Sequence, residues 1–291
     1  MYDLKGKVAM ITGTARKRGI GRATALRLAK EGADMVIQGR YRPPELRPEW
    51  EKREGWKGLD SLVEEIEALG RQALTVTGDI SVKKEVEQMV AKALDKFGHI
   101  DILVNNASLH SVRDHALIIE MPEEMWNSYL TVNVTGTLLI SQAVARHMKE
   151  HGQGGKIITI SSGQAKSPSK ANAHYSVSKL GMIGLSHVMA LELAPYKINV
   201  NTILPIAVTL PADGQGEIFT DAVHEGLTKE EAMARAYPEE GLEQRVPLGR
   251  LGSPSETANL VAFLASGQSD YITGQVIACD GGTTLERKIP F

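Results

Sequence analysis

The sequence VAMITGTARKRGIG, residues 8–21, decides the fold of this chain. Its first part, Val8–Thr12, is a short apolar run that predicts a buried strand, and the helical spacing of apolar residues over Ile20–Glu31 predicts a helix. Three glycines let the connecting backbone turn sharply and approach a pyrophosphate: Gly13, Gly19 and Gly21. A helix N-terminus offers free N–H groups and the positive end of its dipole. The stretch therefore predicts a dinucleotide-binding turn, with a purely structural turn as the alternative.

Short apolar runs and segments of helical period alternate along the rest of the chain. Further strands are predicted at Met35–Ile37, Ala73–Thr77, Ile100–Val104, Lys156–Ile160, Ile198–Ile203 and Gln275–Ala278. Strands that are apolar on both faces and separated by helices indicate a parallel sheet covered on both sides. We therefore predict an α/β fold: a single doubly wound Rossmann-type parallel sheet with helices on both faces, in one domain over residues 1–291.

Two segments interrupt this alternation. Residues 41–58 contain three prolines and two tryptophans and are predicted to form an ordered surface insertion. Residues 205–246 form a long acid-rich stretch, which we interpret as a substrate-loop region, because long insertions in compact domains are often lids or binding loops. For both segments the alternative is surface or interface decoration.

Composition excludes several classes of protein. The formal net charge is -2, so no basic surface indicates nucleic acid. Cys279 is the only cysteine, which excludes an internal disulfide and a multi-thiolate metal site and fits a reducing compartment. The N-terminus does not resemble a signal peptide, and no apolar run reaches the length of a membrane span. His99, His110, His115 and His147 show no metal-ligand spacing among themselves. We expect a cytoplasmic enzyme without a metal and without a nucleic-acid or membrane partner.

The end of the second predicted strand indicates which cofactor the turn binds. In NAD-binding proteins an acid about 20 residues after the turn accepts the ribose hydroxyls, whereas an arginine there accommodates the additional phosphate of NADP. This chain has Arg40 at that place, and the turn itself adds Arg16, Lys17 and Arg18. Arginine suits bidentate phosphate contact. NADP is therefore favoured, with NAD as the alternative.

Tyr175 and Lys179 form the most informative pair in the chain. The pKa of a phenol is about 10, so tyrosine alone is a poor acid or base near neutrality. A cation one helical turn away lies on the same face and favours the phenolate. The spacing therefore predicts an acid/base residue. His174 points to a different face of that helix, and we expect it to pack in the core or to lie exposed at the rim of the site, without a catalytic role.

The chain resembles the short-chain dehydrogenase/reductase family over nearly its whole length. The resemblance rests on the glycine turn at 12–21 and on the Tyr175-x-x-x-Lys179 pair. It also rests on motifs in the family order: Asp79-Ile80, Asn105-Asn106-Ala107, Val132-Asn133, Ile160-Ser161-Ser162, Ile198-Asn199-Val200-Asn201, Pro247-Leu248-Gly249-Arg250-Leu251-Gly252 and Tyr271-Ile272-Thr273-Gly274-Gln275. Such a resemblance implies hydride transfer with a nicotinamide cofactor.

The resemblance also implies roles for four catalytic residues. Tyr175 would exchange a proton with the substrate oxygen, and Lys179 would lower the pKa of Tyr175 and hold the nicotinamide ribose. Ser162, rather than Ser161, would hydrogen-bond the substrate oxygen, because its offset from Tyr175 resembles the family pattern. Asn133 would anchor a water through which protons reach Lys179; a helix-interior asparagine bonded to backbone is the alternative.

The remaining implied roles concern cofactor contacts. Asp79 and Ile80 would flank the adenine, Asn106 to Ser108 would line the adenosine and ribose, and two later residues would lie beside the nicotinamide. The full predicted set is Gly13, Arg16, Arg18, Gly19, Ile20, Gly21, Arg40, Asp79, Ile80, Asn106, Ala107, Ser108, Tyr175, Lys179, Pro205 and Val208.

Three departures from the family pattern affect these expectations. Five residues separate Gly13 from Gly19 where the usual turn has three, a length that resembles the enoyl-reductase branch. That branch has a tyrosine seven residues before the lysine, and this chain has Asn172 there. Ile206 follows Pro205 where glycine is usual, and Ser108 replaces another glycine.

These features together favour one activity. We expect reversible hydride transfer between NADP(H) and a ketone or secondary alcohol; the ketone could belong to a 3-oxoacyl thioester, a steroid or a sugar-like compound. The alternatives are enoyl or imine reduction and a non-catalytic, cofactor-sensing protein, since a fold alone never guarantees activity. The resemblance implies a homotetramer or homodimer, and the apolar residues Met182, Ile183, Leu185 and Val188 fit a helix at such an interface or in the core.

Overall fold

The computed structural model describes residues 2–40, 43, 45, 47, 49–110, 114–206 and 246–285. Seven strands in these residues form one sheet in the order β3-β2-β1-β4-β5-β6-β7, and all neighbouring strands run parallel. Their bounds are β1 Val8–Ile11, β2 Asp34–Gly39, β3 Ala73–Thr77, β4 Ile102–Asn105, β5 Gly155–Ile160, β6 Ile198–Pro205 and β7 Val276–Cys279. The strand order reverses between β1 and β4, and ligands of such sheets bind where strands end at this switch point.

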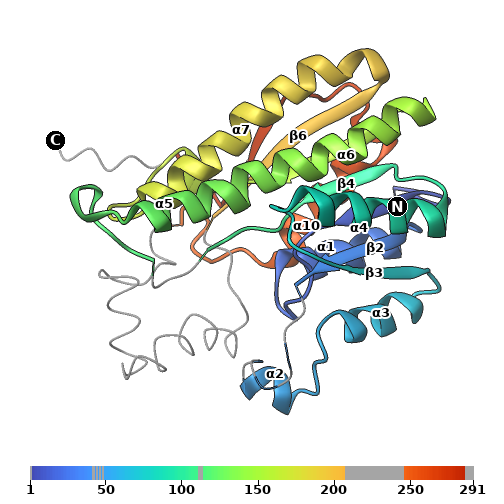
Figure 1. Ribbon diagram of the computed structural model, residues 1–291, viewed down its shortest axis with the longest axis horizontal. Helices are drawn as coiled ribbons and strands as arrows, with labels where there is room; N and C mark the ends of the chain where they lie inside the picture. The colour runs from blue at the N-terminus through green and yellow to red at the C-terminus, as the bar shows by residue number, and fades with distance from the viewer. Residues whose placement is uncertain are drawn as a thin grey trace.

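Helices cover both faces of the sheet (Figure 1). One face carries α1 Ile20–Lys30, α3 Leu59–Glu67 and α10 Pro254–Ala265. The other carries α4 Lys83–Phe97, α6 Gly136–His151 and α7 Ala173–Leu193. Shorter elements are α2 Glu49–Arg53, α5 Glu123–Leu130, η2 Ile118–Glu120, η3 Thr131–Thr135, η4 Gly163–Ala165, η5 Ala194–Tyr196 and η7 Gly267–Ser269. The predicted doubly wound parallel sheet with helices on both faces is confirmed.

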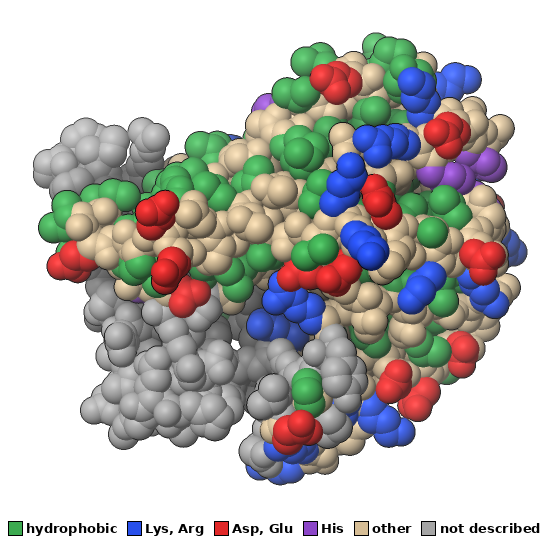
Figure 2. Space-filling view, viewed as in Figure 1, with side chains coloured by type: hydrophobic (Ala, Val, Ile, Leu, Met, Phe, Trp, Pro, Cys, Tyr) green, Lys and Arg blue, Asp and Glu red, His purple; other side chains and the backbone are tan. Residues whose placement is uncertain are grey.

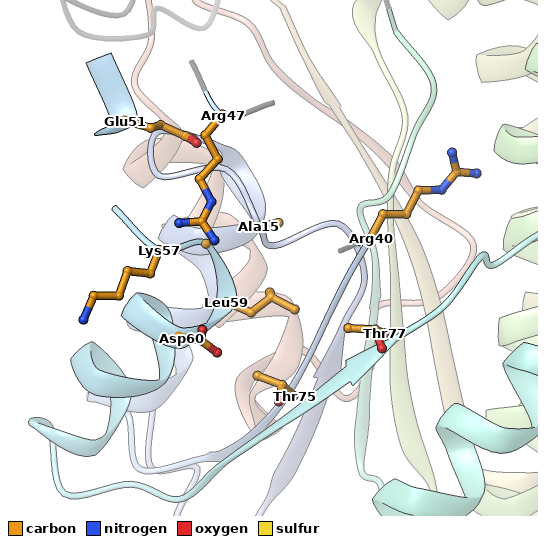
Figure 3. Close-up of a pocket in the computed structure, with 10 residues that line it drawn as sticks. Ala15, Arg40, Arg47, Glu51, Lys57, Leu59, Asp60, Thr75 and Thr77 are labelled. Carbon is orange, nitrogen blue, oxygen red and sulfur yellow. The ribbon is translucent and has the colours of Figure 1, made fainter. Parts of the chain in front are cut away.

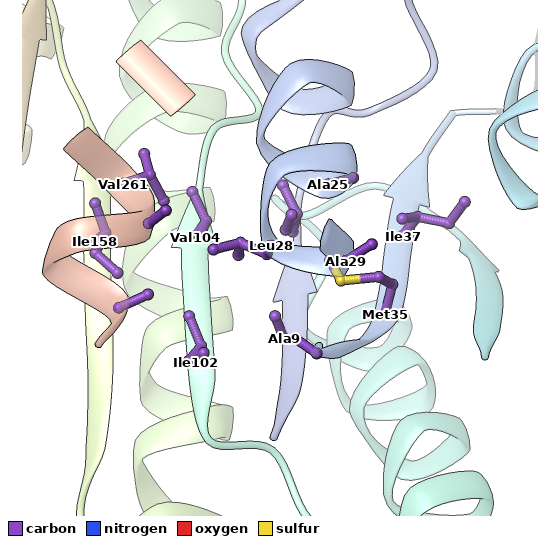
Figure 4. Packing of buried hydrophobic residues seen from close by; sticks show 14 of the residues in the cluster. Ala9, Ala25, Leu28, Ala29, Met35, Ile37, Ile102, Val104, Ile158 and Val261 are labelled. Atoms are coloured by element: carbon purple, nitrogen blue, oxygen red, sulfur yellow. The ribbon is translucent and has the colours of Figure 1, made fainter. Parts of the chain in front are cut away.

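Alternation along the strands divides the core into two halves. Ala9 and Ile11 of β1 pack with α1 and α10, whereas Val8 and Met10 of the same strand pack with α4 and α6. Figure 4 shows the first of these clusters, in which Leu28 of α1 points toward the sheet. Successive side chains of a strand point to opposite faces, so an all-apolar strand must be covered on both.

Among the starts of the strands, that of β4 differs most from prediction. The strand predicted from Ile100 begins at Ile102. Asp101 precedes it and its carboxylate accepts hydrogen bonds from the Val8 backbone and from Lys7 Nζ, both at 2.9 Å. The Asp101 side chain therefore bonds Lys7 and Val8 at the start of β1, and the residue is not part of β4. In contrast, β3 covers the predicted residues Ala73–Thr77.

The two predicted insertions differ in how much the structure describes. The first contains α2, and its Trp56, 4% exposed, hydrogen-bonds the turn after β1. Of the second, residues 207–245 lie outside the described residues. Val208, a predicted nicotinamide contact, is among these.

One described helix is long and apolar enough to cross a membrane by length and composition alone, Ala173–Tyr196. This differs from the expectation that no stretch reaches that length. The helix packs against β6 and carries the buried Lys179, as core helices of globular proteins do.

Candidate active site

The predicted phosphate-binding turn lies at the C-terminal end of β1, where glycine is required twice. Gly13 has a φ of 72°, and a Cβ there would come within 2.7 Å of Ala107 Cα. A Cβ on Gly21 would lie 2.5 Å from the Gly13 carbonyl oxygen. A larger residue at either position would force backbone apart, so the turn packs directly on the end of β4.

The start of α1 fits the phosphates of a dinucleotide. Gly19 is the N-cap residue, no side chain in the described part of the protein caps the helix, and its first turn contains no acid. The first N–H groups of a helix lack partners within the helix, and with the helix dipole they favour an anion. The turn also carries Arg16, close enough for its charge to affect the neighbouring His110.

Two amide side chains hold the turn in place. Asn106 Nδ2 donates to the carbonyl oxygens of Thr12 and Gly13, both at 2.9 Å. Gln38 Oε1 accepts from the Gly13 N–H at 3.0 Å, and Gln38 Nε2 donates to the Gly78 carbonyl at 2.8 Å. Gln38 was not among the predicted site residues. A polar residue at the end of an otherwise apolar strand is the sequence feature that could have identified it. The predicted contact of Asn106 with the cofactor stays a prediction.

The residues predicted at the adenosine end lie together after β2 and β3. Arg40 forms an ion pair with the Asp79 carboxylate. Burial raises the pKa of Asp79, but hydrogen bonds from Ser81 and the charge of Arg40 outweigh it and hold that pKa below its ordinary value. Ile80 is buried, against the position that a Cβ on Gly136 would occupy. The structure thus brings Arg40 beside Asp79, although it leaves Ile80 in the core.

A pocket of about 170 Å³ opens next to Arg40, between α3 and the ends of the outer strands (Figure 3). Arg47 and Asp60 line one side, and Thr75 and Thr77 of β3 line the other. Figure 3 shows the Arg40 guanidinium pointing away from the other lining residues. Arg40 is therefore directed toward Asp79 and not into this pocket.

Three of the four predicted catalytic residues meet between the end of β5 and the start of α7. Ser162 follows β5, and its side chain hydrogen-bonds Tyr175. The Lys179 ammonium lies 5.6 Å from the centroid of the Tyr175 ring and donates to the Ile160 carbonyl at 3.1 Å. The adjacent Ser161 hydroxyl instead donates to the Lys179 carbonyl at 2.8 Å. Ser162, not Ser161, thus faces the phenol.

Burial dominates the electrostatics of this pair. It raises the pKa of Tyr175, while the hydrogen bond with Ser162 acts in the opposite direction. Burial also lowers the pKa of Lys179 from 10.5 to about 7. Because Lys179 is itself poorly able to stay charged here, the lowering of the Tyr175 pKa that we expect from it stays a prediction for the enzyme with cofactor.

Asn133 connects the loop after β4 with α7. It lies in η3, a π-helical turn between α5 and α6, an irregularity often found at functional sites. Its Oδ1 accepts from the Leu109 N–H at 2.7 Å and from Ser108 Oγ at 3.2 Å, while Nδ2 donates to Ser178 Oγ at 2.9 Å. Ser178 precedes Lys179. The described contacts of Asn133 thus reach the helix that carries the ammonium, and a role in anchoring water stays a prediction.

Aromatic rings around Tyr175 were not among the predicted site residues. His110 lies edge-on to Tyr175 with centroids 4.8 Å apart, and the Tyr129 ring lies 6.3 Å away and perpendicular. The Tyr129 hydroxyl donates to Asp114 at 2.8 Å. His174 is fully buried and packs on Tyr129, as expected. His110 follows the Asn105–Ala107 motif closely, which was the signal that could have found it.

The other predicted residues are placed as follows. Pro205 ends β6 and is buried, whereas Arg18 is turned toward Glu54 and its side chain is only 7% exposed. A contact of Arg18 with phosphate would need this ion pair to open. No group of three or more residues able to hold a metal ion occurs in the described part of the chain.

The chain is similar to known proteins over nearly its whole length. A family model described as enoyl-(acyl carrier protein) reductase matches residues 13–284. The chain is 37% identical to an L-rhamnose 1-dehydrogenase (NAD(P)(+)) of Azotobacter vinelandii, over 95% of this chain and 96% of that protein. It is 35% identical to a 3-oxoacyl-[acyl-carrier-protein] reductase of Thermotoga maritima, over 97% and 99%. The structure of carveol dehydrogenase from Mycobacterium avium in complex with NAD is similar, with a TM-score of 0.81, 28% identity and coverage of 98% and 100%.

Proposed function

The chain belongs to the short-chain dehydrogenase/reductase family of oxidoreductases, and from that premise we propose that it interconverts a ketone and a secondary alcohol with NADP(H). The observation that carries this proposal is the cluster of Ser162, Tyr175 and Lys179 at the C-terminal edge of the sheet, on the same edge as the glycine turn. A carbonyl that gains a hydride needs a proton donor, here Tyr175, and a hydrogen bond to its oxygen, here from Ser162. The cation of Lys179 favours the phenolate that remains.

Each residue of the cluster has a distinct part in this reaction. When bound, the nicotinamide supplies or accepts the hydride. Ser162 and Tyr175 hold the substrate oxygen by hydrogen bonds, and Tyr175 gives its proton to that oxygen during reduction and removes it during oxidation. Lys179 stabilises the phenolate and would hold the ribose hydroxyls of a bound cofactor. Asn133 keeps α7 and the loop after β4 in register, and it anchors the water through which Lys179 regains a proton.

Arg40 supports NADP(H) as the cofactor. It follows β2, where the sequence has no acid to accept the ribose hydroxyls, and its ion pair with Asp79 is open to solvent, since the Arg40 side chain is 64% exposed. Exposed ion pairs contribute little to stability. Arg40 can therefore leave Asp79 for a phosphate, with Arg16 of the turn as the second cation.

Replacing Arg40 with Gln tests this assignment. We expect the dissociation constant of NADPH to rise about tenfold or more, because a hydrogen-bonded charge pair with phosphate is lost, and that of NADH to change little. Calorimetric titration of both cofactors measures this, with Arg53→Gln on α2 as the matched control. Equal changes for both cofactors, or a wild-type enzyme that prefers NADH, would contradict the assignment.

Enoyl reduction is the second candidate, favoured by the description of the matching family model and by the five-residue turn. Against it, the position seven residues before Lys179 is Asn172, whose side chain is 7% exposed and donates to Gln164 Oε1 at 2.9 Å. An amide in that arrangement cannot act as the acid.

A substrate panel separates the two reactions. The enzyme is assayed with NADPH and NADH against 3-oxoacyl thioesters, sugar-like ketones, simple ketones and the matching conjugated enones, by loss of reduced-nicotinamide absorbance. We expect turnover of ketones and none of the enones. Reduction of the enones alone would establish the second candidate, and the absence of any turnover would favour a cofactor-sensing protein.

We also propose that two copies of the chain associate through α7. Met182 and Ile183 are buried in the core, but a second apolar stripe on the helix is exposed: Val177, Leu180, Val188 and Leu191. Leu191 is 79% exposed, and Figure 2 shows hydrophobic side chains along the face that α6 and α7 form. An apolar stripe of this kind marks a protein–protein interface.

Replacing Val188 with Lys should break this association. A lysine placed in an apolar interface must be desolvated, so we expect the molar mass in solution to fall at least by half. Light scattering after size-exclusion chromatography measures the mass, with Val82→Lys at the exposed N-cap position of α4 as the control. An unchanged mass would show that α7 is not the interface.

A further inference from the structure

We infer that residues 54–58 are a clamp that fixes the phosphate-binding turn, and that Trp56 and Glu54 are positioning residues for the cofactor. The inference rests on the proposed function, because the turn matters only if it binds a nicotinamide cofactor. It concerns the two features that distinguish this chain: the surface insertion and the five residues between Gly13 and Gly19. Hydrogen bonds join these two features to each other.

The backbone of the turn is held from the side of the insertion. Trp56 Nε1 donates to the Ala15 carbonyl at 3.1 Å, and Trp56 is 4% exposed. Arg22 of α1 lies over the Trp56 ring, 5.3 Å from its centroid, and donates to the Lys17 carbonyl at 3.0 Å. The indole of Trp56 thus bonds one carbonyl of the long turn, that of Ala15, directly. It also contacts Arg22, which bonds a second, that of Lys17.

Glu54 determines where the cations of the turn point. Its carboxylate accepts hydrogen bonds from Lys17 Nζ and Arg18 Nη2, both at 2.5 Å. The hydrogen bond from Lys17 and the charges of both cations lower the pKa of Glu54, so the carboxylate stays ionised near neutrality. Lys17 and Arg18 are therefore directed to the insertion, whereas the charge of Arg16 acts on His110, which packs against Tyr175.

The clamp is itself firmly built. The backbone N–H of Trp56 donates to the Glu51 carbonyl at 2.8 Å. The backbone N–H of Lys57 donates to Ser61 Oγ at 3.0 Å, which joins the segment to α3. Gly55 and Gly58 have φ of 64° and 75°, in the left-handed region that favours glycine, and so let the chain reverse on each side of the indole. Arg22 is also paired with Glu65 of α3. Insertion, α1 and α3 thus hold the turn between them.

A turn of this length would otherwise adopt many conformations. Fixing the backbone of a residue costs conformational entropy, and a flexible turn would lose this entropy on binding the cofactor. A turn that is already ordered avoids that loss and binds more tightly. The clamp should therefore lower the dissociation constants of NADPH and NADH alike, because both carry the same pyrophosphate.

Two variants test the clamp. Trp56→Phe keeps an aromatic ring but loses the N–H donor, and we expect the dissociation constants of both cofactors to rise about threefold to tenfold. Glu54→Arg places like charges against Lys17 and Arg18, and we expect a rise of about tenfold or more. The charge exchange Glu54→Arg with Arg18→Glu should recover most of the lost affinity, while Arg53→Ala at the adjacent position should leave affinity unchanged. Calorimetric titration well below the melting temperature measures each.

Two further readouts separate positioning from mere folding. Hydrogen–deuterium exchange of the ligand-free protein should rise in the peptide that contains residues 14–19, and not in β5 or α7. The KM for the cofactor should rise while kcat at saturation is kept. Unchanged affinity and exchange in both variants, or no recovery by the charge exchange, would overturn the clamp. A wild-type protein that binds neither cofactor would instead overturn the proposed function.

Discussion

Replacement of Tyr175 with Phe should reduce kcat by about a thousandfold or more while leaving cofactor affinity within about threefold of the wild type. General acid–base catalysis contributes typically about 10²–10⁴-fold, and Tyr175 is the residue that would supply it here. The variant removes one oxygen atom and keeps the ring, which packs against His110 and lies near Tyr129. The loss should therefore fall on the chemical step and not on the structure of the site.

Tyr129→Phe is the matched control for this experiment. Tyr129 is 1% exposed, lies 6.3 Å from Tyr175 between ring centroids, and loses its hydrogen bond to Asp114 in the variant. We expect this change to lower stability by about 1 kcal/mol and to keep turnover within about threefold. Steady-state kinetics with the best ketone, together with cofactor titration, measure both variants. If Tyr175→Phe kept turnover, the proton would have to come from another group, and the proposed mechanism would be wrong.

The sequence predicted the fold because its strongest patterns are local. The run at 8–21 contains strand, turn and helix within one short stretch, and the apolar strands require helices on both faces whatever the details of packing. The pair Tyr175 and Lys179 could be recognised in the same way, because one helical turn fixes the distance between them. The ends of elements were harder to predict: Asp101 ends one pattern by bonding to a strand that is distant in sequence.

Contacts between distant segments explain what the sequence could not predict. Nothing in the pattern of residues 41–58 shows that Glu54 meets Lys17 and Arg18, or that Trp56 reaches Ala15. Arg18 was therefore predicted to contact the cofactor, although the structure directs it to Glu54. Gln38 was missed for the same reason, since its partners belong to two other loops. Residue type and spacing indicated which side chains could bind a cofactor, but not which of them were already paired with other residues of the protein.

Lys179 gives the second large expected effect, in both turnover and stability. Replacing it with Met should lower kcat about a hundredfold or more, because the phenolate of Tyr175 loses its cation. Stability should respond differently. Burial lowers the pKa of Lys179 from 10.5 to about 7 in the folded protein, whereas the unfolded chain keeps the ordinary value. Between these two values the unfolded chain binds a proton that the folded chain lacks.

This difference sets the sign of the pH dependence. The contribution of Lys179 to the free energy of unfolding should rise as pH increases from about 7 toward 10.5, by at most about 1.4 kcal/mol per pH unit, and below about 7 this group should add no further slope. Lys179→Met lacks the titrating group, so its curve should be flatter, and it should be the more stable protein near pH 7. Its unpaired Ile160 carbonyl offsets part of that gain, by about 1–3 kcal/mol, equally at each pH.

Denaturant unfolding at about pH 7, 8 and 9, without cofactor, measures these slopes. Lys179→Arg is the third member of the series, because arginine stays charged throughout this range. It should be less stable than the wild type, and the gap should widen as pH rises, since only the lysine can escape the burial of charge by losing its proton. Burial keeps the pKa of Tyr175 above its ordinary value and that of His110 at about 4, so neither group titrates in this window. If the free energies of unfolding of the wild type and Lys179→Met changed in parallel with pH, the ammonium would remain charged in the folded protein. Its surroundings at Tyr175 would then stabilise the charge by more than burial destabilises it.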